Sequence, residues 1–275
     1  MHTSRSDGAL SPEEAVEKYR AAGYDFLAVT DHWKLSENCC VNGVTLLSGC
    51  EFDFGSNPRE GVYHVVGVGF TSDPGITRGD TPADAIEKIH MAGGVADIAH
   101  PAWSMNTLEQ LKNASAADYT EIYNSVSDFP RNCRAYSGNI VDICAANGLD
   151  FKLAAVDDTH WYGAEFAKSF IYLFADECTP DAIKNAIRSG DFYASQGPHL
   201  NAFRDGDSII VECPVEDEIE MITYFTDTVW ENHRSDVGTN LTRSVHKLSG
   251  RESFIRVEVR NSRGEVGWSQ VIRTK

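Results

Sequence analysis

Several short apolar segments of this sequence end in, or carry, side chains that bind divalent metal ions. The candidate ligands are imidazoles and carboxylates: His2, Asp7, His32, Glu51, His64, His100, Asp158 and His160. A single histidine at the end of a strand is usually a hydrogen-bonded structural residue, but its repetition at successive segments is not expected from chance. Because the set contains nitrogen and oxygen donors and no thiolate, it suits Zn, Mn or Fe without choosing among them. The pattern predicts a shared divalent-metal centre.

Cationic and aromatic residues lie next to these ligands in the sequence. Arg5 and Lys34 are candidates for holding a substrate phosphate, although ordinary exposed loop cations would look the same. Trp33, Trp103 and Trp161 each follow a candidate histidine within three residues. Either they shield the metal ions, or at least one forms a wall for a planar leaving group such as a nucleobase, where stacking contributes about 1–3 kcal/mol per base. The second interpretation favours a nucleotide or a short oligonucleotide as substrate.

Capped helices alternate with the apolar segments. Helix starts are predicted at Ser11, Thr81 and Thr179, each followed directly by proline and then by an acidic residue in the first turn. Another helix is predicted over residues 131–147. The apolar segments between the helices are residues 26–30, 44–49, 63–70, 95–99, 120–123 and 152–156. This alternation predicts parallel strands with helical crossovers, closed into a barrel whose active site lies at the carboxyl ends of the strands.

The pattern changes after about residue 200. Four β-rich segments follow without an amphipathic helix between them: residues 208–213, 218–226, 253–260 and 269–274. Turn signals at residues 205–207 and 262–265 fall between these segments. The sequence therefore predicts an α/β fold in two domains, with a barrel over residues 1–199 and a small antiparallel β-sandwich over residues 200–275.

The motifs that carry the candidate ligands resemble those of the PHP family, metal-dependent phosphoesterases named for polymerase-associated domains and histidinol phosphatases. They are HTSRSDG (2–8), TDH (30–32), GCE (49–51), His64 in the following strand, AHP (99–101) and DDTH (157–160). FYASQGP (192–198) and the β-rich segments after it resemble a two-domain subgroup of the same family. The resemblance implies a distorted (β/α)7 barrel that carries two or three divalent metal ions.

The resemblance also distributes the ligands among the ions. It places His2, Glu51 and Asp158 on the first ion, Glu51, His64 and His100 on the second, and Asp7, His32 and His160 on the third. Two ions that share Glu51 would lower the pKa of a bound water, and the resulting hydroxide would attack the phosphorus atom of a phosphoester. Asp158 or His160 would protonate the leaving group, and Asp31 is expected to accept a hydrogen bond from a ligand ring.

Two positions, Met1 and Asp157, differ from the usual family pattern, and a third, Cys50, lies next to a candidate ligand. The family usually begins with two histidines separated by one residue, and Met1 occupies the middle position. The first histidine and the first strand are therefore expected to lie upstream of the printed chain. Asp157 stands where the family often has serine, and we expect a solvated or supporting acid there. Cys50, beside the bridging carboxylate, is expected to be a small buried apolar residue.

Composition excludes some partners. The net charge of −17 without a basic run argues against binding long nucleic acids, whereas metal ions would offset the charge locally for a small phosphorylated substrate. No apolar run approaches the roughly 20 residues of a transmembrane helix, so no membrane partner is predicted. Seven cysteines without CxxC spacing indicate reduced, mostly buried thiols and a cytoplasmic location. The sequence leaves the oligomeric state open.

Two alternatives to a phosphoesterase remain at this point. One is a metallohydrolase of the amidohydrolase type that cleaves C–N bonds, although no lysine ends a central strand as that class would require. The other is a non-catalytic PHP-like protein that binds metal, carbohydrate or protein. The missing first histidine is the one sequence feature that favours it.

Overall fold

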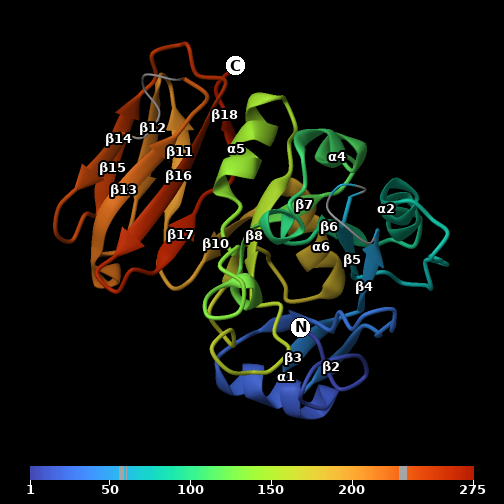
Figure 1. The fold of residues 1–275 in the computed structure, drawn as a ribbon. Helices are drawn as coiled ribbons and strands as arrows, with labels where there is room; N and C mark the ends of the chain where they lie inside the picture. Colours follow the sequence, from blue (N-terminus) through green and yellow to red (C-terminus); the bar gives the residue numbers. More distant parts are fainter. Residues whose placement is uncertain (56–58, 60, 229–233) are drawn as a thin grey trace.

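The chain begins with alternating helices and strands and ends with strands alone (Figure 1). The computed structural model describes residues 1–55, 59, 61–228 and 234–275. Its α-helices are α1 (Pro12–Ala21), α2 (Pro82–Met91), α3 (Pro101–Ser104), α4 (Leu108–Asn113), α5 (Gly138–Ala146) and α6 (Pro180–Ser189). The strands of the first part are β1 (Phe26–Ala28), β2 (Cys39–Val41), β3 (Val44–Leu47), β4 (Gly49–Phe54), β5 (Tyr63–Val68), β6 (Val95–Ile98), β7 (Tyr119–Asn124) and β8 (Lys152–Val156).

The three predicted helix starts are confirmed. Ser11, Thr81 and Thr179 are the N-caps of α1, α2 and α6, and each side chain accepts a hydrogen bond from a backbone N–H of the first turn. The first two also form complete capping boxes. Each cap satisfies an N–H that has no partner within its own helix, so the local sequence was sufficient to set these boundaries.

The helix predicted over residues 131–147 is wrong for its first half, because α5 begins only after Ser137. The preceding residues bond to β7 instead of forming helical turns. The N–H of Asn124 donates to the carbonyl of Ala135 at 3.0 Å, and the N–H of Ser137 donates to the carbonyl of Ile122 at 2.9 Å. Tertiary pairing has therefore overridden the helical pattern here.

Strands β1 to β8 form two sheets that are only partly parallel. One has the order β1-β3-β2 and the other the order β4-β5-β6-β7-β8. The predicted parallel pairing is right for β1–β3, β6–β7 and β7–β8 and wrong for β4–β5 and β5–β6, which are antiparallel. An isolated parallel bridge between His32 and Glu51 joins the two sheets. The fold of this part is thus mixed α/β.

Glycine permits the antiparallel reversal between β4 and β5. Gly55 and Gly61 both have positive φ, and a Cβ on Gly55 would lie 1.7 Å from the carbonyl oxygen of Gly61. A larger residue at position 55 could not occupy this backbone conformation at this distance. The two glycines therefore lie close together next to the antiparallel strands β4 and β5.

The strands of the last part are all antiparallel. They are β9 (Phe170–Leu173), β10 (Phe192–Ser195), β11 (Asn201–Asp205), β12 (Ser208–Glu212), β13 (Ile219–Phe225), β14 (Arg234–Val237), β15 (Arg243–Lys247), β16 (Phe254–Asn261), β17 (Val266–Trp268) and β18 (Ile272–Arg273). One sheet has the order β14-β13-β16-β17-β10-β9 with β18 beside β16, and another has the order β11-β12-β15. The larger sheet crosses residue 199, so the boundary proposed there does not coincide with a sheet edge.

Each part has an apolar cluster of its own, and a further cluster, which includes Leu153 and Trp268, joins the two parts. Ile86 and Ile89 of α2 are fully buried against β4–β6. In the C-terminal part, Ile209, Ile222 and Val257 are fully buried in one cluster. Figure 1 shows the orange and red sheets beside α5, away from β4 and β5. The candidate ligands therefore depend on the first core for their placement.

The cysteine and membrane predictions have different outcomes. All seven cysteines are free, and Cys50 is fully buried as expected. Four of the seven are exposed, so the expectation of mostly buried thiols is wrong. No helix within the described residues is long and apolar enough to cross a membrane.

Candidate metal centre

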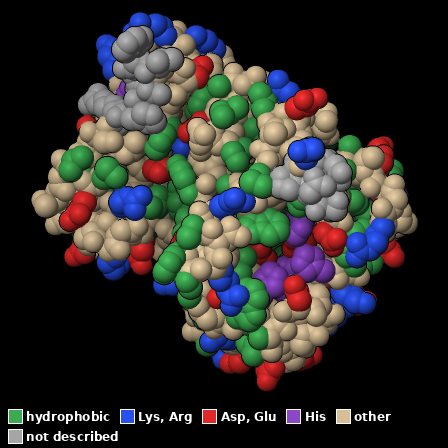
Figure 2. Space-filling model, viewed as in Figure 1, with side chains coloured by type: hydrophobic (Ala, Val, Ile, Leu, Met, Phe, Trp, Pro, Cys, Tyr) green, Lys and Arg blue, Asp and Glu red, His purple; other side chains and the backbone are tan. Residues whose placement is uncertain are grey.

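The ends of five strands bring the predicted ligands to one place. His32 follows β1, Glu51 and His64 lie in β4 and β5, and His100 follows β6. Asp158 and His160 follow β8, while His2 and Asp7 precede α1. Figure 2 shows histidines gathered in a hollow on one face, bordered by acidic and basic side chains. All eight residues fall into three groups whose ligand atoms lie within 4.8 Å of one another.

The first group consists of Glu51, His64 and His100. His64 Nδ1 lies 2.5 Å from Glu51 Oε1, and His100 Nε2 lies 3.8 Å from the same oxygen. The Glu51 side chain is only 3 % exposed. A nearly dry carboxylate oxygen therefore faces two imidazole nitrogens, which is a donor set typical of a divalent metal site.

The second group uses the other oxygen of Glu51. His2 Nε2 lies 2.9 Å from Glu51 Oε2 and 3.0 Å from Asp158 Oδ1. Glu51 thus presents one oxygen to each of two neighbouring groups. This is the arrangement that a bridging carboxylate requires.

The third group consists of His2, Asp7, His32 and His160. Asp7 Oδ2 lies 3.4 Å from His160 Nε2 and 3.8 Å from His32 Nε2, while Asp7 Oδ1 lies 3.4 Å from His2 Nδ1. The sequence placed Asp7, His32 and His160 together. The structure adds the second ring nitrogen of His2, which lies between the second and third groups.

Buried polar atoms in the centre fit a cation. Both ring nitrogens of His2 and Nδ1 of His32 are buried without a hydrogen bond of acceptable geometry. Buried polar groups without partners are rare in folded proteins. A divalent ion between the imidazoles and the carboxylates would satisfy these atoms, so the residues present fit the metal that the sequence implies.

The pKa values of the centre follow from competition between burial and close opposite charges. Burial disfavours the ionised form of Glu51, but the three surrounding histidines outweigh it and hold its pKa well below the usual value. Burial likewise opposes protonation of His2, yet the carboxylates around it raise its pKa well above the usual value. The pKa of His100 rises to about 9, chiefly because Glu51 outweighs the effect of burial. These positions therefore favour positive charge, which a metal ion would supply in place of protons.

His160 is arranged differently from the other imidazoles. Its Nδ1 lies 2.7 Å from the carbonyl oxygen of Asp158, which fixes the proton on Nδ1. Burial lowers the pKa of His160, so the ring is neutral near pH 7. Nε2 is then an unprotonated donor facing Asp7. This geometry supports a ligand role for His160 in preference to protonation of a leaving group.

A buried network that the sequence did not identify supports two ligands. Glu121 accepts a hydrogen bond from the backbone N–H of His100 at 2.7 Å and from Asn124 Nδ2 at 2.8 Å. Asn124 Nδ2 also lies 3.2 Å from Asp158 Oδ2. His100 and Asp158 both have positive φ, 32° and 49°, a conformation that costs free energy and needs such support. The only sequence signal was the polar end of the segment that became β7.

The two acids next to ligands in sequence hold loops in place. Asp31 accepts hydrogen bonds from Thr3 and Ser6, not from a ligand ring as predicted. Of the two alternatives for Asp157, a solvated or a supporting acid, the structure agrees with the second: Asp157 is buried and accepts hydrogen bonds from Tyr19 and from three backbone N–H groups of residues 167–169. Both acids thereby position the loops that carry Asp7 and Asp158.

The three tryptophans occupy different surroundings. Trp103 packs against His64 and His100 with ring centroids 5.5 and 4.9 Å apart, and Trp161 stacks on His160 at 5.2 Å. Trp33 instead packs on two phenylalanines of β4, and its indole N–H donates to Asp53. Two of the three therefore border the candidate centre.

Neither predicted phosphate-binding cation is held against the ligands. Arg5 is exposed and its guanidinium donates to the carbonyl of Leu35 at 2.7 Å. Lys34 is exposed as well. Their assignment to a substrate phosphate stays a prediction.

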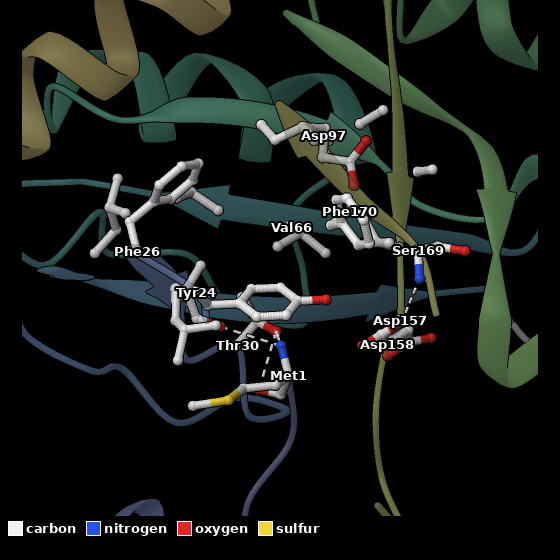
Figure 3. A pocket seen from close by; sticks show the side chains of 18 of the residues that line it. Met1, Tyr24, Phe26, Thr30, Val66, Asp97, Asp157, Asp158, Ser169 and Phe170 are labelled. Carbon is white, nitrogen blue, oxygen red and sulfur yellow. Dashed lines mark hydrogen bonds between the residues drawn. The ribbon is translucent and has the colours of Figure 1, made fainter. Parts of the chain in front are cut away.

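A cavity of about 400 Å³ includes the candidate ligands Glu51 and Asp158 in its lining, and Figure 3 shows it with Asp158 labelled. Apolar and acidic side chains line it, among them Phe26, Val66, Asp97 and Asp158. Asp97 Oδ1 is buried without a partner among the described residues, and burial followed by repulsion from Glu121 raises the pKa of Asp97 well above its usual value. The buried carboxyl therefore holds a proton more strongly than an exposed aspartate does.

The first residue runs alongside the end of β1 at one side of this cavity. The Met1 ammonium donates to the carbonyl of Ala28 at 3.1 Å, and the N–H of Thr30 donates to the carbonyl of Met1 at 3.0 Å. Burial lowers the pKa of this ammonium group, although nearby carboxylates oppose the effect. These contacts fix the position of the adjacent His2.

Comparisons with known proteins reveal similarity in structure only. No protein-family model matches the chain, and no curated protein sequence matches it. A two-domain protein from Bacteroides vulgatus that contains a predicted PHP-like metal-dependent phosphoesterase has a TM-score of 0.55 at 15 % identity, over 99 % of this chain and 93 % of that one. An amidohydrolase from Chromobacterium violaceum has a TM-score of 0.45 at 17 % identity, over 60 % of this chain and 87 % of that one.

The comparison over nearly the whole length establishes the fold. At 15 % sequence identity, the two proteins share a backbone fold, and this likeness does not indicate which substrate the chain binds. The sequence motifs resemble those of the PHP family, and the fold of the chain is similar to that of a two-domain protein containing a predicted PHP-like phosphoesterase. The two observations therefore agree.

Proposed function

We propose that this chain is a metal-dependent phosphoesterase that hydrolyses a small phosphorylated substrate with a metal-activated water. The observation that carries the proposal is the position of Glu51, whose two oxygens face two separate groups of ligands. Two adjacent ions that share a carboxylate would stabilise both the attacking and the leaving oxygen of an in-line displacement. Zn, Mn and Fe all suit the mixed imidazole and carboxylate donors.

The residues of the centre have separable tasks in this proposal. Glu51, His64 and His100 would hold one ion, Glu51, His2 and Asp158 another, and Asp7, His32 and His160 a third. The bound ions would supply hydroxide at neutral pH by lowering the pKa of water. The pKa of Asp158 lies at about 2, because its contact with His2 outweighs burial, so this carboxylate is an ionised ligand and a poor proton donor. Protonation of the leaving group is therefore assigned to neither Asp158 nor His160.

Charge and shape favour a small substrate. The net charge of −17 repels a long polyanion, whereas ions in the hollow attract a single phosphate locally. Trp103 and Trp161 border the ligands and would form an apolar wall beside the reacting phosphate. We therefore propose a nucleotide or a very short oligonucleotide as one substrate class, with Trp33, Arg5 and Lys34 at the outer edge of the site.

We also propose the finer architecture that accompanies this function. Residues 1–199 would form the distorted (β/α)7 barrel with the metal centre at one end, and residues 200–275 the β-sandwich. The free thiols agree with a reducing compartment such as the cytoplasm. Support for two domains comes from the full-length likeness to a two-domain protein, and each part also has an apolar cluster of its own besides the cluster that joins them.

The test is hydrolysis by metal-free protein reconstituted with Zn, Mn or Fe. The probes are a phosphomonoester, a phosphodiester and an amide, and the variants are His64→Ala and the control His90→Ala. His90 lies on α2, outside the hollow, and contacts Asp118 at 2.8 Å. His90→Ala therefore shows the effect of removing an imidazole that is not a candidate ligand. We expect metal-dependent phosphoester hydrolysis that is lost in His64→Ala and kept in His90→Ala.

Two outcomes would overturn the proposal. Cleavage of the amide without cleavage of either phosphoester would assign the chain to C–N bond hydrolysis. Stoichiometric metal binding without hydrolysis of any probe would favour a binding protein.

A further inference from the structure

A second cavity of about 400 Å³ has none of the eight candidate ligands in its lining. Three loops line it: residues 123–131 at the end of β7 and after it, residues 164–168 after β8, and residues 263–265 between β16 and β17. Gln196, after β10, completes the wall. The cavity therefore lies where loops of the first part meet a turn of the C-terminal part.

The carboxylates of this cavity already have partners. Asp128 accepts from the Tyr123 hydroxyl at 2.6 Å, and Glu165 accepts from the backbone N–H of Trp161 at 2.7 Å. Glu265 pairs with Arg263 at 2.9 Å. Arg263 offsets the charge of Glu265, whereas the donors to Asp128 and Glu165 are neutral groups.

Two further cations line the cavity, and one of them, Lys168, interacts electrostatically with Glu265. Among the described residues, neither the Arg131 guanidinium nor the Lys168 ammonium forms an ion pair, and both side chains are exposed. The guanidinium carbon of Arg131 lies 3.1 Å from the ring centroid of Trp161, a cation–π contact that orients the side chain. The cavity therefore offers an oriented guanidinium and a nearby ammonium to an anion.

The loop of residues 157–169 connects this cavity to the metal centre. Trp161, which contacts Arg131, also stacks on His160 at 5.2 Å. The backbone N–H of Lys168 donates to Asp157 at 2.8 Å, directly before the candidate ligand Asp158. A substrate whose phosphate lies at the metal centre can therefore extend past Trp161 toward Arg131.

We propose that this cavity is a subsite for a second anionic group of the substrate, held by Arg131 and Lys168. The inference rests on the proposed phosphoesterase function and narrows its substrate class to phosphoesters that carry another acidic group. The planar guanidinium matches phosphate and carboxylate alike through paired N–H donors, so the shared chemistry is an oxyanion. Trp161 would then position Arg131 and also border the reacting phosphate.

The experiment compares two matched pairs of substrates with the metal-loaded full chain. Adenosine 3′,5′-bisphosphate against adenosine 5′-monophosphate tests a second phosphate, and 3-phosphoglycerate against glycerol 3-phosphate tests a carboxylate. The variants are Arg131→Gln and Lys168→Gln. Arg134→Gln is the control, because Arg134 is an exposed cation of the same loop that does not line the cavity.

We expect the wild type to prefer the doubly anionic member of at least one pair by tenfold or more in kcat/KM. Arg131→Gln and Lys168→Gln should reduce this preference about tenfold, mainly through KM, and Arg134→Gln should not. Equal rates within both pairs, or an equal loss on both members of a pair, would overturn the subsite while the phosphoesterase function stands. No hydrolysis of any probe would overturn both.

Discussion

Replacing Glu51 with glutamine tests the bridging role with the smallest change in shape. Glu51→Gln keeps the size of the side chain and removes one negative charge from a carboxylate that is 3 % exposed and faces His2 at 2.9 Å and His64 at 2.5 Å. Loss of a residue that only supports a metal ligand typically costs 10–100-fold in affinity. Loss of a ligand that two metal ions share should reduce the affinity for both ions. We therefore expect the affinity for each of the two ions to fall at least about 100-fold, or about 2.7 kcal/mol.

The assay is titration of metal-free protein with Zn or Mn by calorimetry, followed by elemental analysis of the loaded protein. Glu87→Gln is the matched control, because Glu87 is an exposed acid on α2. Wild type and control should bind the same number of ions, and Glu51→Gln should bind fewer, with hydrolysis falling at least 100-fold. Circular dichroism of the metal-free variants checks that the fold persists. Unchanged affinity and ion count in Glu51→Gln would refute the bridging geometry.

Two further changes test the structural support. Arg256 is fully buried on β16 and pairs with both oxygens of Asp142 on α5 at 2.8 and 2.9 Å. Arg256→Met should therefore lower the free energy of unfolding, measured by urea denaturation, by about 3 kcal/mol. A decrease below about 1 kcal/mol would contradict this prediction. Burial raises the pKa of Glu121 to about 7, so the folded metal-free protein binds more protons than the unfolded chain and loses stability as the pH rises from about 4.5 to 7. Glu121→Gln, which keeps an acceptor for the N–H of His100, should therefore gain stability relative to wild type between pH 5 and pH 8. Parallel pH profiles would rule out the raised pKa.

Part of the fold was predictable because it depends on contacts close in sequence. The helix starts at Ser11, Thr81 and Thr179 need only a hydroxyl, a proline and an acid within one turn. The direction of strand pairing does not have this local origin. Strands β4, β5 and β6 pair antiparallel, but the apolar pattern of a strand is the same for either direction of pairing.

The candidate site shows the same division. The ligand types could be read from strand ends, and their grouping followed from family motifs; the structure brings all eight ligands into groups of the predicted composition, with His2 added to the third. Glu121 and Arg131 could not be found in this way. One acts through the backbone of His100 and the other through the ring of Trp161, and both contacts depend on chain segments distant in sequence.

The sequence alone determined the types of the candidate ligands, the helix starts and the change from alternating elements to strands near residue 200, because each depends on residue type and short-range spacing. Tertiary structure decided how the charges are shared. It divided the oxygens of Glu51 between two groups, directed Asp31 and Asp157 to loops, and placed the Arg131 guanidinium over the ring of Trp161. These outcomes depend on burial and on distances between segments far apart in the chain, which residue spacing does not encode.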